Sequence, residues 1–212
     1  MTHRVKSPTL TMGELQLIPF TLHHAQQRAS WEKYGAREPL LAHIDLNFQS
    51  FTEIESWFDH KSTENMFWWA IIHQERLVGE VVIRALNDRE MTGRLGIHFS
   101  PEERSKGYGS LVLSKLLAWF FTDSEYQVLQ LDVAALNTWA INLYEKVGFR
   151  YQYCFWSGHD PRGGIEPFTD QSFSHLKNYF RRHQGKSEVL FLEMSIDKQQ
   201  YLKYHRHMSE QG

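Results

Sequence analysis

The chain has 212 residues, of which 42% are hydrophobic and 23% charged, a composition typical of a globular protein with a sizeable core. A formal net charge of −2 excludes a global basic field, so we expect no nucleic-acid partner. The single cysteine, Cys154, excludes an internal disulfide framework and is typical of a reducing compartment. Apolar runs stay below the roughly 18 residues of a membrane span, and no signal-peptide core precedes the first polar residues. The sequence therefore predicts a cytoplasmic protein with no membrane partner.

Twelve histidines raise the question of a metal site. His23 and His24 are adjacent, while His205 and His207 lie near the C-terminus. None of them shows the His-x-x-x-His spacing that places two ligands on one helix face. Solvated surface histidines are therefore favoured over metal ligands, and we expect no bound metal.

The first part of the chain predicts an arm, a strand and two helices. Residues 1–13 are polar and irregular, and we interpret them as an N-terminal arm. Apolar alternation over 14–20 predicts a strand, and Thr21 is a suitable N-cap for a helix that continues to about residue 33. Thr52 is followed three residues later by Glu55, the spacing of a capping box, which predicts a second helix.

The middle of the chain predicts a three-stranded meander followed by a helix. Apolar, β-branched runs at 66–72, 77–86 and 91–99 are joined by short polar turns, as in consecutive antiparallel strands. Apolar residues over 107–121 then recur with the period of a helix that faces the core.

The last part of the chain predicts a strand, a helix and two more strands, at 128–133, 138–147, 149–156 and 188–196. Residues 158–187 are rich in Gly, Pro and charge, with a short helix around 173–182. We interpret this segment as a pocket lid, a dimer contact or a plain excursion, so a homodimer is one expectation.

Together these elements predict an α+β fold with one mixed, mostly antiparallel sheet flanked by helices. A doubly wound dinucleotide fold would need strands and helices to alternate throughout, and here they do not. We expect a single domain over 14–212, preceded by the arm 1–13 and carrying 158–187 as an extended insertion before the last strand.

The segment Arg104–Gly109, Arg-Ser-Lys-Gly-Tyr-Gly, is the strongest candidate for a binding loop. Glycine allows tight turns and close approach of backbone N–H groups to a ligand, and a helix that begins there adds its unpaired N–H groups, which suits a pyrophosphate. A nucleotide-hydrolase phosphate loop is excluded because Lys106 precedes Gly107 instead of following a second glycine. A dinucleotide fingerprint is excluded because only Gly107 and Gly109 fit it.

A second constellation runs from Asn137 to Phe149. Asn137 and Tyr144 are seven residues apart, close to two helical turns, so both project from nearly the same face. Ala140 lies between them and keeps that face low, and Gly148 is placed as the left-handed residue after the helix. The alternative is a plain amphipathic helix, with Asn137 as its N-cap and Tyr144 as a core aromatic.

Together the two constellations resemble the GNAT superfamily of acetyl-CoA-dependent N-acetyltransferases. The family pattern Arg/Gln-x-x-Gly-x-Gly/Ala matches Arg104–Gly109, and the pattern Asn-x-x-Ala-x-x-x-Tyr-x-x-x-Gly-Phe matches Asn137–Phe149. The resemblance covers about 14–156 in element order. The segments 17–21 and 77–80 are most similar to the branch of ribosomal-protein and polyamine N-acetyltransferases.

The resemblance implies a V-shaped splay between the strands 91–99 and 128–133, with acetyl-CoA as cosubstrate. The backbone near His98 and Phe99 would pair with the pantetheine amides, and Asn137 would hydrogen-bond the same arm. Tyr144 would place its phenol near the thioester sulfur and protonate the leaving thiolate, since an ordinary tyrosine is protonated at neutral pH. The pyrophosphate would be held by the backbone amides of the glycine loop, which are those of Ser105, Lys106, Gly107, Tyr108, Gly109 and Ser110.

The general base departs from the family pattern. Some members carry a glutamate ten residues before the loop arginine, and this chain has Arg94 there. Glu80 on the neighbouring strand is the first substitute, acting directly or through water, and His98 is the second. The alternative for Glu80 is an edge or surface carboxylate.

The resemblance implies an enzyme that moves an acetyl group from acetyl-CoA to a primary amine in a ternary complex. The amine acceptor would be a small molecule or a peptide N-terminus. The alternative is a non-catalytic acyl-CoA-binding or regulatory module on the same fold, although mere binding does not need an acid such as Tyr144 at the sulfur.

Overall fold

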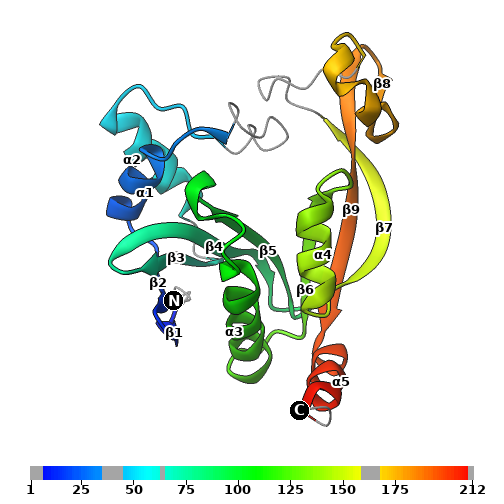
Figure 1. The fold of residues 1–212 in the computed structure, drawn as a ribbon. Helices are drawn as coiled ribbons and strands as arrows, with labels where there is room; N and C mark the ends of the chain where they lie inside the picture. Colours follow the sequence, from blue (N-terminus) through cyan, green and yellow to red (C-terminus); the bar gives the residue numbers. More distant parts are fainter. Residues whose placement is uncertain (1–6, 35–44, 63–64, 159–167, 210–212) are drawn as a thin grey trace. The chain divides into compact units, whose positions relative to one another are not determined.

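The computed structural model describes residues 7–34, 45–62, 65–158 and 168–209, with side chains to residue 204 (Figure 1). The strands are β1 (Leu10–Met12), β2 (Leu15–Pro19), β3 (Phe67–His73), β4 (Arg76–Asn87), β5 (Thr92–Phe99), β6 (Val128–Ala134), β7 (Arg150–Gly158), β8 (Phe180–His183) and β9 (Lys186–Asp197). The helices are α1 (Leu22–Ala29), α2 (Phe51–Lys61), α3 (Tyr108–Thr122), α4 (Thr138–Lys146) and α5 (Lys198–Ser209), with short 3-10 helices η3 (Pro101–Glu103) and η5 (Gln171–Tyr179).

The strands form one sheet in the order β1-β2-β3-β4-β5-β6-β9-β7, and β8 pairs with β9 beside this path. The neighbours from β1 to β5 are antiparallel, β5 and β6 are parallel, and β9 is antiparallel to both β7 and β8. The mixed, mostly antiparallel α+β sheet with flanking helices is therefore confirmed.

The chain divides into two compact units. The first comprises 1–32, 46–130 and 196–212, and the second comprises 33–45 and 131–195. The first unit contains β1 to β5 with α1, α2, α3 and α5, and the second contains α4, β7 and β8. The boundary passes through β6 and near the end of β9.

One face of the first unit's sheet packs against α3. The apolar stripe predicted for this helix is buried, and Trp119 makes edge-on contacts with Phe67 and Trp69 of β3. The ring centroids of Trp69 and Trp119 are 5.2 Å apart. Alternation along β3 and β4 therefore directs one set of side chains to α3 and leaves the other set for the opposite face.

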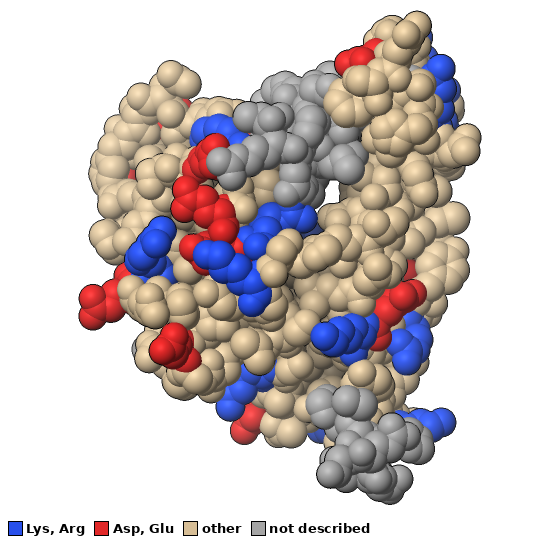
Figure 2. All heavy atoms as spheres, viewed as in Figure 1, with Lys and Arg blue, Asp and Glu red and all other residues tan. Residues whose placement is uncertain are grey.

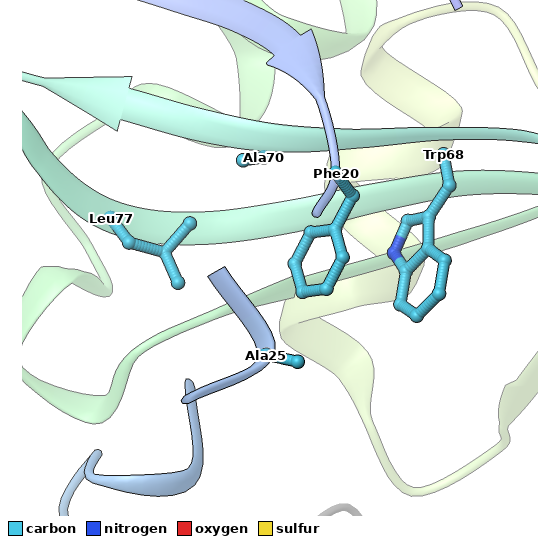
Figure 3. Packing of buried hydrophobic residues seen from close by; sticks show 5 residues of the cluster. All are labelled: Phe20, Ala25, Trp68, Ala70 and Leu77. Carbon is cyan, nitrogen blue, oxygen red and sulfur yellow. The ribbon is translucent and has the colours of Figure 1, made fainter. Parts of the chain in front are cut away.

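The opposite face packs against α1 and α2. Figure 3 shows the rings of Phe20 and Trp68 face to face, with Ala25 of α1 and Ala70 of β3 nearby. The Phe20 and Trp68 centroids are 4.2 Å apart with an interplanar angle of 6°, and Phe58 of α2 stacks on both rings. This aromatic layer joins both helices to the sheet.

The second unit has a small core of its own. Phe180 of β8 and Val189 of β9 are buried, and Phe173 and Leu176 of η5 pack against them. The predicted insertion thus contains a 3-10 helix and the added strand β8, while residues 159–167 lie outside the described part of the chain.

Several predicted local features are corrected by the structure. Leu10–Met12, assigned to the arm, forms β1 and pairs with β2. The predicted cap at Thr52 is wrong: Ser50 is the N-cap of α2, and its hydroxyl accepts the Glu53 N–H. The helix after Thr21 ends at Ala29, several residues earlier than predicted.

The C-terminal helix α5 was not predicted.

No described helix is both long enough and apolar enough to cross a bilayer. On the face drawn in Figure 2, the described Lys and Arg side chains are interspersed with Asp and Glu, in keeping with the small net charge.

Candidate functional site

The predicted binding loop joins β5 and η3 to α3. Gly107 has φ 83° and is the N-cap of α3, and Ser105 also has a positive φ of 62°. A Cβ built on Gly107 would meet nothing within 4 Å, so the space above this residue is open. Two left-handed residues just before a helix curl the chain so that its N–H groups converge, an arrangement suited to an anionic ligand.

Side chains fasten this loop to the rest of the first unit. Lys106 Nζ lies 2.9 Å from Oε2 of Glu103, whose side chain is buried. The Tyr108 hydroxyl lies 3.3 Å from Nδ1 of His73 in β3, and Nε2 of that ring lies 3.1 Å from Glu14 Oε2. Gly109 is buried at the start of α3, whereas Arg104 and Ser110 are half-buried. The loop is therefore held by its own backbone and by a few partly buried side-chain contacts.

β5 carries the residues predicted to meet the pantetheine arm. Its parallel pairing with β6 covers three residue pairs, from Thr92–Val128 to Arg94–Gln130. His98 and Phe99 lie further along β5, and they pair on the other side with Glu80 and Gly79 of β4. The splay expected from the resemblance would begin just after the last of the three pairs.

Glu80 is the centre of a buried polar cluster. Its residue is 4% exposed, and its Oε1 accepts from Nη1 of Arg28 in α1 at 2.7 Å. Oε1 also lies 3.2 Å from Nδ1 of His98, and Oε2 accepts the indole N–H of Trp68 at 3.2 Å. Three elements, α1, β3 and β5, thus direct donors at one carboxylate on β4, which we call the Glu80 cluster.

The surroundings keep this carboxylate ionised. Burial alone would raise the pKa of Glu80, but the Arg28 guanidinium and the hydrogen bonds from His98 and Trp68 outweigh it and lower the pKa. Arg28 is itself 8% exposed in its side chain and lies over the Trp57 ring at 5.3 Å. A charged carboxylate with all these donors is therefore suited to accepting hydrogen bonds and poorly suited to taking up and releasing a proton.

The alternative interpretation of Glu80 as an edge or surface carboxylate is wrong, because β4 is an interior strand and the side chain is buried. Sequence reasoning missed Arg28 altogether. The signal was a cation on the same helical face as the buried Ala25, three residues earlier.

His98 differs from Glu80 in exposure. Its side chain is 30% exposed, and Nδ1 is the ring nitrogen turned to the carboxylate. Among the described residues, none is a hydrogen-bond partner of Nε2. The strands are close here: a Cβ on Gly79 would lie 2.6 Å from the His98 carbonyl oxygen. His98 is therefore held at Nδ1, and Nε2 has no hydrogen-bond partner among the described residues.

The second motif forms α4 in the second unit. Asn137 is its N-cap, and its side-chain oxygen accepts the Ala140 N–H at 3.2 Å. Gly148 has φ 108° just after the helix, as predicted. The capping role of Asn137 is confirmed, and its contact with pantetheine stays a prediction.

Tyr144 lies on the buried side of α4. Its residue is 8% exposed, and its ring lies 5.8 Å from that of Phe149 in an edge-on arrangement. Burial raises the pKa of Tyr144 to about 12, so the phenol is protonated throughout the physiological range. It is a proton donor and not an anion at neutral pH.

The prediction that the histidines are solvated surface residues is wrong for one of them. His24 is buried instead of solvated, and burial followed by the neighbouring His23 lowers its pKa. Within the described residues, no three His, Cys, Asp or Glu side chains are grouped so that they could hold a metal ion. The side chains of His205 and His207 lie outside the described part.

The predicted site residues thus fall into two groups. The first unit holds Glu80, His98, Phe99, Arg104, Ser105, Lys106, Gly107, Tyr108, Gly109 and Ser110. The second holds Asn137, Ala140 and Tyr144. Of the first group, the structure brings Glu80 and His98 into direct contact.

Comparison with known proteins gives a consistent set of matches. The model of the acetyltransferase (GNAT) family matches residues 26–149, more than half of the chain. A spermidine N(1)-acetyltransferase of Vibrio cholerae is 25% identical over 154 residues, which cover 70% of this chain and 80% of that protein.

Solved structures of the same kind share the fold. The spermidine N-acetyltransferase of Vibrio cholerae, in complex with CoA and spermine, superposes with a TM-score of 0.64 at 18% identity, covering 90% of this chain and 99% of that one. An acetyltransferase (GNAT family) from Bacillus anthracis gives a TM-score of 0.63 at 15% identity, with 91% and 99% covered.

Proposed function

The chain belongs to the GNAT acetyltransferase family and transfers the acetyl group of acetyl-CoA to an amine, and from this premise we propose how its own residues divide the work. The backbone of the loop 105–110 binds the pyrophosphate of acetyl-CoA. The backbone near His98 and Phe99 and the side chain of Asn137 bind the pantetheine arm. Residues 14–212 act together as one catalytic domain.

Tyr144 is the general acid in this proposal. Its phenol donates a proton to the thiolate as the C–S bond of the thioester breaks. The observation that carries the assignment is its place at the motif tyrosine position on the buried side of α4, where a pKa raised to about 12 keeps the phenol protonated at neutral pH. A non-catalytic module would have no use for such a donor.

The acceptor is a primary aliphatic amine. Spermidine is the first compound to test because the Vibrio cholerae relative is named for it, and a peptide with a free N-terminus is the second. The reaction takes place in the cytoplasm, where acetyl-CoA and free amines are both present. Release of free CoA thiol on adding each amine to enzyme and acetyl-CoA measures the preference.

Replacing Tyr144 by Phe tests the proposal most directly. The ring and its packing remain while the proton donor is lost, so we expect kcat to fall about 100- to 10,000-fold. The dissociation constant for CoA, measured by calorimetry, is expected to stay within about threefold, below 1 kcal/mol. A variant with near-normal kcat and reduced stability would make Tyr144 a core aromatic and nothing more.

A further inference from the structure

The Glu80 cluster contains a histidine whose two ring nitrogens have different surroundings. Nδ1 of His98 lies 3.2 Å from Glu80 Oε1, and that carboxylate is ionised. An ionised carboxylate only accepts hydrogen bonds, so Nδ1 of His98 must be the protonated ring nitrogen that donates this one. In the neutral ring, Nε2 then bears the lone pair, and the His98 side chain as a whole is 30% open to solvent.

The carboxylate that sets this tautomer is itself fixed. Arg28 Nη1 binds the same Oε1 at 2.7 Å, and the Trp68 indole N–H binds Oε2 at 3.2 Å. Glu80 and His98 are also directly opposite each other in the β4–β5 register, so their side chains share the α1–α2 face of the sheet. These contacts oppose rotation of the Glu80 carboxylate and of the His98 ring.

From these contacts we infer that His98 is the general base of the acetyl transfer and that Glu80 and Arg28 are its positioning residues. The inference rests on the proposed acetyl transfer to an amine. It assigns the proton to His98 rather than to Glu80, because a carboxylate already bound by three donors and held at low pKa has little capacity for another proton. Arg28 acts only through the carboxylate.

The proton balance of the step is as follows. Nε2 takes one proton from the acceptor ammonium, and the freed amine nitrogen forms a C–N bond with the thioester carbonyl carbon. The C–S bond breaks, the thiolate takes the Tyr144 proton, and the tyrosinate recovers a proton from the nitrogen of the intermediate. His98 then releases its proton to solvent, so one proton is lost in each turnover.

The first experiment separates a base from a structural histidine by varying the acceptor. Ethylamine and 2,2,2-trifluoroethylamine have similar shapes, but the fluorinated amine is far less basic and is already unprotonated at pH 7. We expect His98→Gln to lower kcat at least about 100-fold with ethylamine or spermidine, and far less with trifluoroethylamine. Equal losses with both amines, or kcat within threefold of the wild type, would overturn the assignment.

The matched control is His183→Gln. His183 also faces a glutamate, with Nδ1 3.6 Å from Glu188 Oε1, but it lies on the exposed β8–β9 hairpin. This variant is expected to keep full activity with every amine. CoA affinity and the thermal midpoint are measured in both variants, so that loss of folding or of cosubstrate binding is recognised separately.

A second measurement does not depend on turnover. Long-range ¹H–¹⁵N spectra of protein labelled with [¹⁵N]histidine distinguish the two imidazole tautomers, and His98→Gln identifies the His98 signals. We expect Nδ1 to be protonated and Nε2 to be bare in the wild type, and the opposite tautomer would overturn the inference. If the wild-type enzyme acetylates no amine of the panel, the proposed function fails, and the spectra still decide the tautomer.

The positioning role is tested with the double variant Glu80→Gln/Arg28→Met, which removes both charges of the buried pair together. Without the carboxylate, we expect His98 to lose its single tautomer and kcat to fall about tenfold or more, as when an orienting carboxylate is removed from a catalytic histidine. A double variant that keeps the wild-type tautomer and kcat would remove Glu80 and Arg28 from the mechanism.

Discussion

The Glu80 cluster and the loop 104–110 lie in the same unit but hold their polar groups in opposite ways. The cluster is buried and built from side chains of α1, β3, β4 and β5, which converge on one carboxylate. The loop is exposed at residues 105–107 and shaped by its backbone, with left-handed residues at Ser105 and Gly107. The cluster proposed for the acceptor side therefore depends on every partner being present, whereas the loop proposed for the cosubstrate depends on local chain geometry.

The largest effect is expected where a buried charge loses its partner. Glu80→Gln removes the negative charge that lies 2.7 Å from the buried Arg28 guanidinium, so we expect the free energy of unfolding to fall by about 3–5 kcal/mol. Urea denaturation at pH 7 measures this loss. The double variant Glu80→Gln/Arg28→Met should recover much of it, because neither charge remains.

The surface control for this prediction is Glu14→Gln. Glu14 also accepts from a histidine, at 3.1 Å from His73 Nε2, but its side chain is 74% exposed. Its removal is expected to change stability by less than about 1 kcal/mol. Equal losses for Glu14 and Glu80 would mean that burial does not distinguish the two carboxylates.

Acid should weaken the Glu80 cluster. Because the pKa of Glu80 is lowered on folding, its contribution is complete above the unfolded value of about 4.3 and is lost as the pH falls through the folded value. The pKa of His24 is also lowered on folding, so in any variant that retains His24 the free energy of unfolding falls further below about pH 6.5.

The stability difference between the wild type and the Glu80→Gln/Arg28→Met variant isolates the carboxylate, because the His24 contribution cancels. We expect the difference, followed by urea denaturation from pH 7 to pH 3, to be constant down to about pH 4.3 and to move against the wild type below it. A difference that stays constant to pH 3 would contradict a lowered pKa for Glu80.

The smallest of these effects is expected in the loop. Gly107→Val forces a β-branched residue into the left-handed region at φ 83°, at a cost of about 1–2 kcal/mol, and it places side-chain atoms over the open side of the loop. We expect CoA to bind at least about tenfold more weakly by calorimetry. Gly185→Val is the matched control: Gly185 has φ 75° with open space around it, and its replacement should cost similar stability without changing CoA affinity.

The same contrast explains what the sequence could predict. The loop and α4 are local: Gly107, Asn137 and Gly148 determine caps and turns within a few residues, and these features were found where they were expected. The three-stranded meander and the α3 stripe were likewise predictable, because period and turn residues specify them directly.

The Glu80 cluster could not be predicted in the same way. Arg28 and Glu80 are 52 positions apart, and neither periodicity nor propensity indicates that a helix cation will meet a strand carboxylate. The α2 cap was missed because Ser50 and Thr52 each precede an acidic residue by three positions, and only packing of the helix distinguishes them. β1 has three residues and α5 is strongly polar, so both lack a clear apolar pattern.

Gly79 has a consequence for how this protein would respond to random mutation. The residue has no reactive group and touches no substrate in the proposed mechanism. A single methyl added there would nevertheless press against the His98 carbonyl oxygen, the Phe99 ring and a methyl group of Ile71. Any of the other amino acids would shift the strand that carries the histidine. In a deep mutational scan scored by activity, substitutions at position 79 should therefore be tolerated as poorly as substitutions of the active-site residues. The reason is only that this position has no room for a side chain.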